Sequence, residues 1–151
     1  MKAIRIIGLD VGDARTGVAI SDPLSLSAQP LTTIEAKTLA QCLGQLKEII
    51  EKNTVSEIVI GLPRKLDGSL AEQGQRVLKF HSKLQRYLDS FPEFASIKLS
   101  LWDERLSTAQ AQRVLSDSKL KNKEKSAALD RVSAAIILDS YLQAKSQNNN
   151  N

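Results

Sequence analysis

The stretch Ile4–Asp22 constrains the fold of this chain more than any other segment. It holds two short apolar runs joined by a Gly/Asp turn, which is the pattern of a β-hairpin. Because side chains alternate along a strand, the carboxylate of Asp10 falls on the same face as Ile6 and Gly8. A carboxylate that continues an apolar row costs free energy to bury unless another group compensates it. Asp10 is therefore the first candidate for a functional residue.

The remainder of the chain alternates between helical and strand periodicity, which predicts a single α/β domain with a mixed sheet over residues 1–145. The Asn-rich residues 146–151 are expected to form a disordered tail. A polar, basic loop is expected over Ser116–Lys125. Further strands are predicted at Leu31–Ile34, Ser56–Gly61 and Ile97–Trp102, and helices at Leu39–Lys52, Ser69–Ser90, from Ser107 or Thr108 to Leu115, and Ser126–Ala144.

Composition narrows the class of protein. A chain of 151 residues with 42% hydrophobic and 25% charged residues can fill one soluble core. It contains no apolar run long enough for a membrane span, and its lone Cys42 excludes an internal disulfide. We therefore expect a cytoplasmic protein without a signal peptide and without a membrane partner. The net charge of +4 is compatible with a polyanionic partner.

Acidic residues stand where the predicted elements meet. Asp10 ends the first strand, and Asp103 and Glu104 end the last one. If these strands are parallel, their carboxyl ends lie at one edge of the sheet, where α/β proteins bind ligands. Asp130 heads the apolar stripe by which the last helix is expected to pack. Converging carboxylates without His or Cys suit Mg²⁺ or Mn²⁺, and paired ions of this kind serve phosphodiester hydrolysis.

The residues alone leave two questions open. The acids could have only structural roles, with Asp10 and Asp103 in turns and Asp130 exposed or capping its helix. Alternation also groups Asp103 with Leu101 and Glu104 with Trp102, and this pattern does not say which of the two acids belongs to a site.

Four blocks of this sequence resemble the blocks of the YqgF/RuvX family, in the same order and over most of the chain. They are GLDVGDARTGVAISD (Gly8–Asp22), GLPRKLDGS (Gly61–Ser69), WDERLSTAQA (Trp102–Ala111) and LDRVSAAIILDSYL (Leu129–Leu142). The family is described as Holliday junction resolvases and pre-16S rRNA nucleases. The resemblance implies an RNase H-like fold whose five-stranded mixed sheet has the order 3-2-1-4-5 and is flanked by helices.

The resemblance also implies a site and an activity. The acidic residues of a two-metal nuclease site match Asp10, Glu104 and Asp130 here, which selects Glu104 over Asp103. The implied cofactors are two Mg²⁺ or Mn²⁺ ions. The implied role is trimming the 5′ end of 16S rRNA from its precursor.

Basic residues near these blocks are candidates for contacts with phosphate. The alternative for each is an exposed cation that only faces solvent or steadies a turn. These candidates are Arg15, Arg64, Lys65, Arg105, Lys121 and Lys123.

Three other functions compete with an rRNA nuclease. A Holliday junction resolvase could use the same site and would act as a two-fold dimer. The chain is therefore expected to be a homodimer if it is a resolvase, and a monomer would weigh against that function. A nucleotide-binding protein of the actin/sugar-kinase type would share the Asp10–Gly12 loop, but the chain is too short for the two domains such proteins need. A non-catalytic RNA- or ribosome-binding module would not need the acids.

Overall fold

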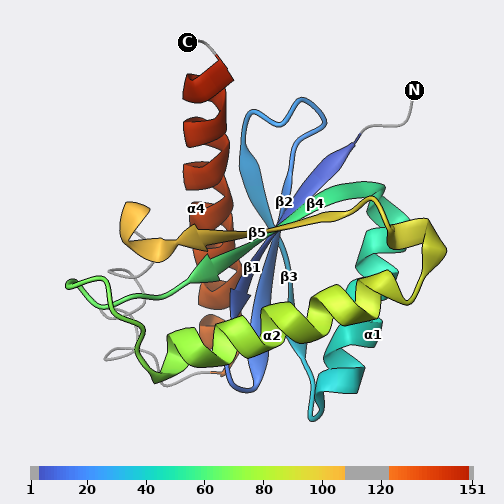
Figure 1. Cartoon of the computed structure of the whole chain (residues 1–151), viewed down its shortest axis with the longest axis horizontal. Helices are drawn as coiled ribbons and strands as arrows, with labels where there is room; N and C mark the ends of the chain where they lie inside the picture. Colours follow the sequence, from blue (N-terminus) through green and yellow to red (C-terminus); the bar gives the residue numbers. More distant parts are fainter. Residues whose placement is uncertain (1–3, 108–122, 150–151) are drawn as a thin grey trace.

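One mixed sheet organises the molecule (Figure 1). The computed structural model describes residues 4–107 and 123–149 and arranges five strands in the order β3-β2-β1-β4-β5. β1 and β2 pair antiparallel, as do β2 and β3, whereas β1, β4 and β5 run parallel to one another. The predicted order 3-2-1-4-5 is thus confirmed. The strands are β1 (Arg5–Val11), β2 (Arg15–Ser21), β3 (Ala28–Glu35), β4 (Val55–Leu62) and β5 (Lys98–Asp103).

Helices cover both faces of the sheet. Figure 1 shows α1 (Leu39–Asn53) and α2 (Glu72–Asp89) on one side and α4 (Lys123–Asn149) on the other. Two short 3₁₀ turns, η1 (Pro92–Phe94) and η2 (Glu104–Leu106), flank β5. No helix in the described ranges is both long and apolar enough to span a bilayer.

Strand alternation divides the core into two layers. In β1, Ile7 and Leu9 are fully buried against α1 and α2, while Ile6 packs against α4. The apolar stripe predicted for the last helix is observed, since Ala134 and Leu138 are completely buried against this second face. Each strand of the sheet centre is therefore apolar on both sides, as expected for parallel strands covered by helices.

The elements differ from the prediction at their ends. α2 begins at Glu72 rather than Ser69, because the backbone and hydroxyl of Ser69 both bond to Asp67 and close a turn. α4 begins at Lys123 rather than Ser126. It continues to Asn149, through residues 146–149 for which a disordered tail was predicted. The predicted helix to Leu115 lies outside the described residues, apart from Ser107, which follows η2, and so does most of the basic loop.

A buried polar cluster that does not include Asp10, Glu104 or Asp130 joins α4 to the sheet. Glu57 in β4 is only 5% exposed and accepts hydrogen bonds from Ser100 at 2.8 Å and from Tyr141. Burial alone would raise the pKa of Glu57, but the hydrogen bonds from Tyr141 and Ser100 and the charge of Lys145 outweigh it and lower the pKa. Burial and the bond to Glu57 raise the pKa of Tyr141 to about 12.

The Tyr141→Phe variant tests this cluster. We expect it to lower the free energy of unfolding by about 1.5–3 kcal/mol at neutral pH, because a buried charged carboxylate loses a hydrogen bond. The lowered pKa of Glu57 means that its stabilising contribution is complete above the ordinary Glu pKa and is lost as pH falls through the folded-state value. The difference between wild type and variant should therefore shrink in acid.

Urea unfolding at neutral pH and below the ordinary Glu pKa measures this difference. Tyr87→Phe is the matched control, because the Tyr87 ring packs against Phe91 and no hydrogen bond joins it to Glu57. A deficit in Tyr141→Phe that stays constant with pH would contradict the role given to Glu57.

Candidate active site

Asp10 lies near the end of the central strand, on the face that α4 covers. Its neighbours along this face are apolar or small, and the residue is only 6% exposed. A β-carbon on Gly8, two residues earlier, would lie 2.8 Å from Cβ of Leu138 in α4. The helix therefore sits directly over this part of β1, and the prediction that Asp10 shares a face with Ile6 and Gly8 is confirmed.

Gly17 brings Asp130 close to Asp10. Gly17 of β2 is the cross-strand partner of Asp10. A β-carbon on Gly17 would overlap the carbonyl group of Asp130 and lie 2.8 Å from the backbone nitrogen of Arg131. The backbone of α4 can approach β2 this closely only because Gly17 has no side chain. Two acids far apart in sequence thus become neighbours.

Asp10 and Asp130 line the same cavity. Its volume is about 510 Å³, and the rest of its wall consists of the β1–β2 turn and Gln73 of α2. The Gln73 amide donates to the carbonyl oxygen of Val11 at 2.7 Å, which ties the beginning of α2 to the end of β1. Gln73 was not among the predicted site residues. Its position at the start of a helix gave no signal that it would reach the end of β1.

Arg15 forms an ion pair with Asp130. Its Nε lies 2.7 Å from Oδ2 of the carboxylate, and both side chains are about a quarter to a third exposed. Arg15 begins β2, and its carbonyl oxygen accepts from the backbone of Gly12 across the turn at 2.9 Å. The hairpin therefore places a cation on the wall of the cavity that the two acids line.

Glu104 lies on the same face of the sheet, beyond the end of β5. It is 1% exposed, and a β-carbon on Gly61 would lie 2.8 Å from its Oε1. The register of β1 and β4 pairs Leu9 with Ile60, so the next pair in these parallel strands sets Asp10 beside Gly61. Glycines therefore stand on both sides of Asp10, one beneath Asp130 and one beneath Glu104.

The donor set suits a hard cation, but a complete ligand shell is not formed. Asp10, Glu104 and Asp130 offer only carboxylate oxygens, which Mg²⁺ and Mn²⁺ prefer. Over residues 4–107 and 123–149, however, no three Asp, Glu, His or Cys side chains lie close enough together to hold one metal ion. The role of these three acids as metal ligands stays a prediction.

Asp103 belongs to a different cluster. Its carboxylate accepts from Arg105 Nη2 at 2.7 Å and lies 3.9 Å from Arg64 Nε. The hydrogen bonds from Arg105 hold the pKa of Asp103 below its usual value. Arg64 also donates to the carbonyl oxygen of Gly68 at 2.8 Å. Arg64 and Arg105 thus brace the loop after β4 at the same edge of the sheet.

The remaining predicted substrate contacts are less defined. Lys65 is exposed in the turn that follows β4. Lys121 lies outside the described residues, and Lys123 is the first residue of α4. Among the described side chains, the structure therefore brings Arg15 to the acidic cavity and groups Arg64 with Arg105 around Asp103.

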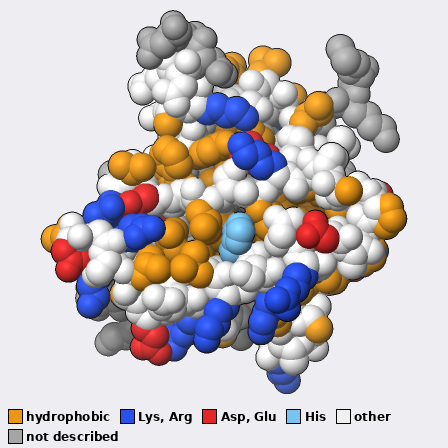
Figure 2. Space-filling model, in the orientation of Figure 1, with side chains coloured by type: hydrophobic (Ala, Val, Ile, Leu, Met, Phe, Trp, Pro, Cys, Tyr) orange, Lys and Arg blue, Asp and Glu red, His pale blue; other side chains and the backbone are white. Residues whose placement is uncertain are grey.

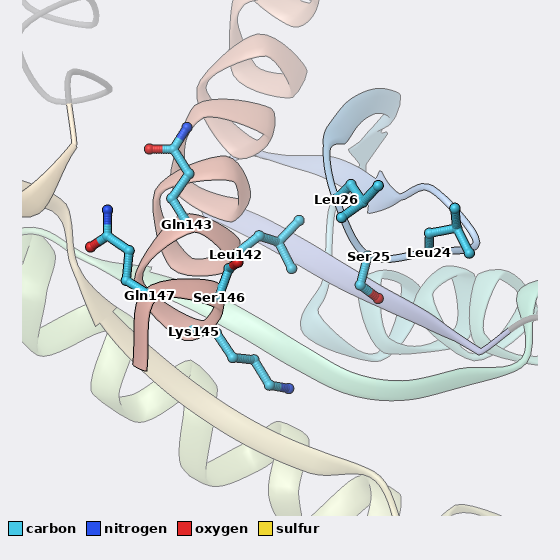
Figure 3. Close-up of a pocket in the computed structure, with 8 residues that line it drawn as sticks. All are labelled: Leu24, Ser25, Leu26, Leu142, Gln143, Lys145, Ser146 and Gln147. Carbon is cyan, nitrogen blue, oxygen red and sulfur yellow. The ribbon is translucent and has the colours of Figure 1, made fainter. Parts of the chain in front are cut away.

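A second cavity of about 470 Å³ lies between the β2–β3 loop and the C-terminal part of α4 (Figure 3). Leu24, Ser25 and Leu26 face α4 residues from Leu142 onward, and its lining contains no acid. Leu142 lies about 18 Å along the helix from Asp130. This cavity is separate from the acidic one.

Solved structures with a similar fold are Holliday junction resolvases. The structure titled "T. thermophilus RuvC in complex with Holliday junction substrate" matches with a TM-score of 0.59 and 11% identity, over 95% of this chain and 96% of that one. The yeast mitochondrial resolvase Ydc2 matches with a TM-score of 0.59 and 16% identity, over 99% and 82%. At these identities the likeness shows the fold alone, which is RNase H-like as predicted.

Sequence relatives cover nearly the whole chain. A protein of Clostridium botulinum strain Hall is 40% identical over 144 residues, which are 95% of this chain and 100% of the relative. One of Halothermothrix orenii is 42% identical over 139 residues, or 92% and 94%. Both carry the name "Putative pre-16S rRNA nuclease". The family model described as "RuvX: Holliday junction resolvase" matches residues 4–144, and the chain therefore belongs to the RuvX family.

Proposed function

We propose that this chain is a metal-dependent nuclease that hydrolyses phosphodiester bonds. The observation that carries the proposal is the open cavity that Asp10 and Asp130 share at the carboxyl edge of the parallel strands. Adjacent carboxylates repel one another and destabilise a core, so a cation is the natural partner for them. Mg²⁺ or Mn²⁺ held by Asp10, Glu104 and Asp130, most simply as two ions, would activate water and stabilise charge on phosphate oxygens.

Cations of the chain would position the substrate. Arg15 keeps the carboxylate of Asp130 at the cavity and adds a positive charge to its wall, where a phosphate group would approach. Arg64 and Arg105 stand at the same sheet edge beside Asp103. The full set of proposed substrate contacts is Arg15, Arg64, Lys65, Arg105, Lys121 and Lys123.

The proposed substrate is the 5′ end of 16S rRNA in its precursor. Support comes from the relatives named "Putative pre-16S rRNA nuclease", which are 40–42% identical to this chain over almost their whole length. An rRNA substrate implies a cytoplasmic location, which agrees with the single buried free thiol, Cys42.

Cleavage of four-way DNA junctions is the second candidate. The description of the family model and the resolvases of similar fold favour it. Such a substrate has two-fold symmetry, so a resolvase is expected to act as a homodimer. A chain that remains a monomer in solution would favour the rRNA nuclease.

The test is cleavage by the purified full chain with Mg²⁺ or Mn²⁺, on a 5′-extended 16S rRNA fragment and on a four-way DNA junction in parallel. We expect the RNA to be cut, the activity to disappear on chelation and to return when metal is restored. Sedimentation under the same conditions gives the oligomeric state.

The outcomes separate the candidates. Cleavage of the junction alone, by a dimer, would replace the rRNA assignment by the resolvase. Binding of RNA without cleavage of either substrate at any metal concentration would contradict the nuclease and leave an RNA-binding module.

A further inference from the structure

A row of cations follows the exposed face of α2. Arg76, Lys79 and Lys83 are all exposed, and their spacing of three and four residues puts them on one side of the helix. Seven residues of α-helix rise about 10.5 Å, so the row is long enough for several phosphates of one strand. Figure 2 shows Lys and Arg side chains (blue) along the lower part of this face, where α2 runs in Figure 1.

This row borders a groove that adjoins the acidic cavity. A hollow of about 480 Å³ is lined by Arg76, Lys79 and Lys83 together with the β1–β2 turn and Gln73. The same turn and the same Gln73 also line the cavity that Asp10 and Asp130 share. Buried Phe80 forms part of the groove floor. The two spaces therefore adjoin each other at the β1–β2 turn and Gln73.

The charges within the groove change along its length. At the end nearest the acids, Arg76 is paired with Asp13 and, at 2.9 Å, with Glu72. Farther along, neither Lys79 nor Lys83 forms an ion pair with any residue of the described ranges. Their long flexible side chains suit contacts with a phosphate backbone that do not depend on sequence.

We propose that this groove, the α2 track, binds the sugar–phosphate backbone of a nucleic-acid strand on its way to the acidic cavity, with Lys79 and Lys83 as its main contacts. The proposal rests on the nuclease function for its substrate class. It also gives the lysines of the α2 track a role in binding. The carboxylates at the cavity repel phosphate, and the neighbouring positive charges offset that repulsion.

The experiment measures binding of a short fluorescein-labelled single-stranded RNA in the presence of chelator, so that no cleavage interferes. The variant is Lys79→Ala/Lys83→Ala. The control is Lys52→Ala/Lys98→Ala, which removes two exposed lysines near the amino ends of β4 and β5. This control has the same net charge as Lys79→Ala/Lys83→Ala. Affinity is recorded over a range of salt concentrations, and thermal unfolding verifies that each variant is folded.

Two phosphate contacts to a single strand contribute about 1.4 to the slope of log affinity against log salt. We expect Lys79→Ala/Lys83→Ala to lose about that much of the slope and to bind about 25-fold more weakly at 0.1 M salt. The control should keep the wild-type slope. Lys79→Arg/Lys83→Arg should also keep it, because the charges remain.

Equal loss in the variant and in the control would overturn the α2 track, since only net charge would then matter. Absence of measurable RNA binding by the wild type at low salt would overturn it as well. The assay is independent of catalysis. If Lys79→Ala/Lys83→Ala loses part of the salt slope but the wild type cuts no RNA, the α2 track is supported and the nuclease function is refuted. If the wild type cuts RNA but Lys79→Ala/Lys83→Ala binds RNA as tightly as the wild type, the nuclease function is supported and the α2 track is refuted.

Discussion

Asp10→Asn is expected to lower the rate of RNA cleavage by about 10³-fold or more. The variant keeps the shape of the side chain but removes the charge from the acid between Gly17 and Gly61. Metal ions supply several kcal/mol of transition-state stabilisation, and about 1.4 kcal/mol corresponds to each factor of ten in rate. A neutral amide at this position would hold the cation too weakly to provide it.

The same variant should be at least as stable as the wild type in the absence of metal. Asp10 is almost fully buried, so removing its charge removes the free-energy cost of burying a carboxylate. Adding Mn²⁺ should raise the unfolding temperature of the wild type and have less effect on Asp10→Asn, because a ligand that binds only the folded state stabilises it. This readout does not depend on activity.

Asp89→Asn is the matched control, because Asp89 is exposed at the end of α2 and bonds only to Gln85 among the described residues. It should cut RNA at the wild-type rate. If Asp10→Asn and Asp89→Asn were equally active, the activity would belong to a contaminant or to another site, and Asp10 would lose its role.

Gly17→Ala is expected to lower the free energy of unfolding by about 3 kcal/mol or more. Overpacking usually costs about 1–3 kcal/mol, and flexible side chains absorb part of it. Here the added methyl group would meet the backbone of Asp130 and Arg131, which can move only if α4 moves as a unit. The variant should also lose cleavage activity, because Asp130 would be displaced from Asp10.

Gly44→Ala provides the contrast. Gly44 lies within α1, and a β-carbon there has nothing within 4 Å. Alanine should therefore raise the free energy of unfolding by about 0.5–1 kcal/mol through its better helix propensity. Urea unfolding of the two variants measures both effects. Wild-type stability in Gly17→Ala would mean that α4 does not lie against β2 as described.

Periodicity in the sequence was enough to predict the strands and helices of the described residues, although not all of their ends. It placed Asp10 on the face of Ile6, and it predicted the apolar stripe of α4, which is buried as expected. It could not choose between Asp103 and Glu104, because both follow β5. The structure separates them, since Asp103 pairs with arginines and Glu104 is buried over Gly61.

Contacts between distant segments were beyond the reach of local pattern. Nothing near Arg15 in the sequence indicates its ion pair with Asp130, 115 residues away. The start of α2 was missed for a related reason. Serine often caps a helix, but the hydroxyl and the backbone nitrogen of Ser69 both donate hydrogen bonds to Asp67 in a turn. Which of two local bonds a serine makes depends on the rest of the fold.

The place of α4 in the chain sets the time at which the site can form. A ribosome synthesises β1 to β5 before α4, so a nascent chain that ends after η2 already carries Asp10 and Glu104 but not Asp130. Its sheet would also expose Ile6 and Val59, which α4 buries. Any activity that needs Asp130 therefore cannot begin before α4 has been synthesised.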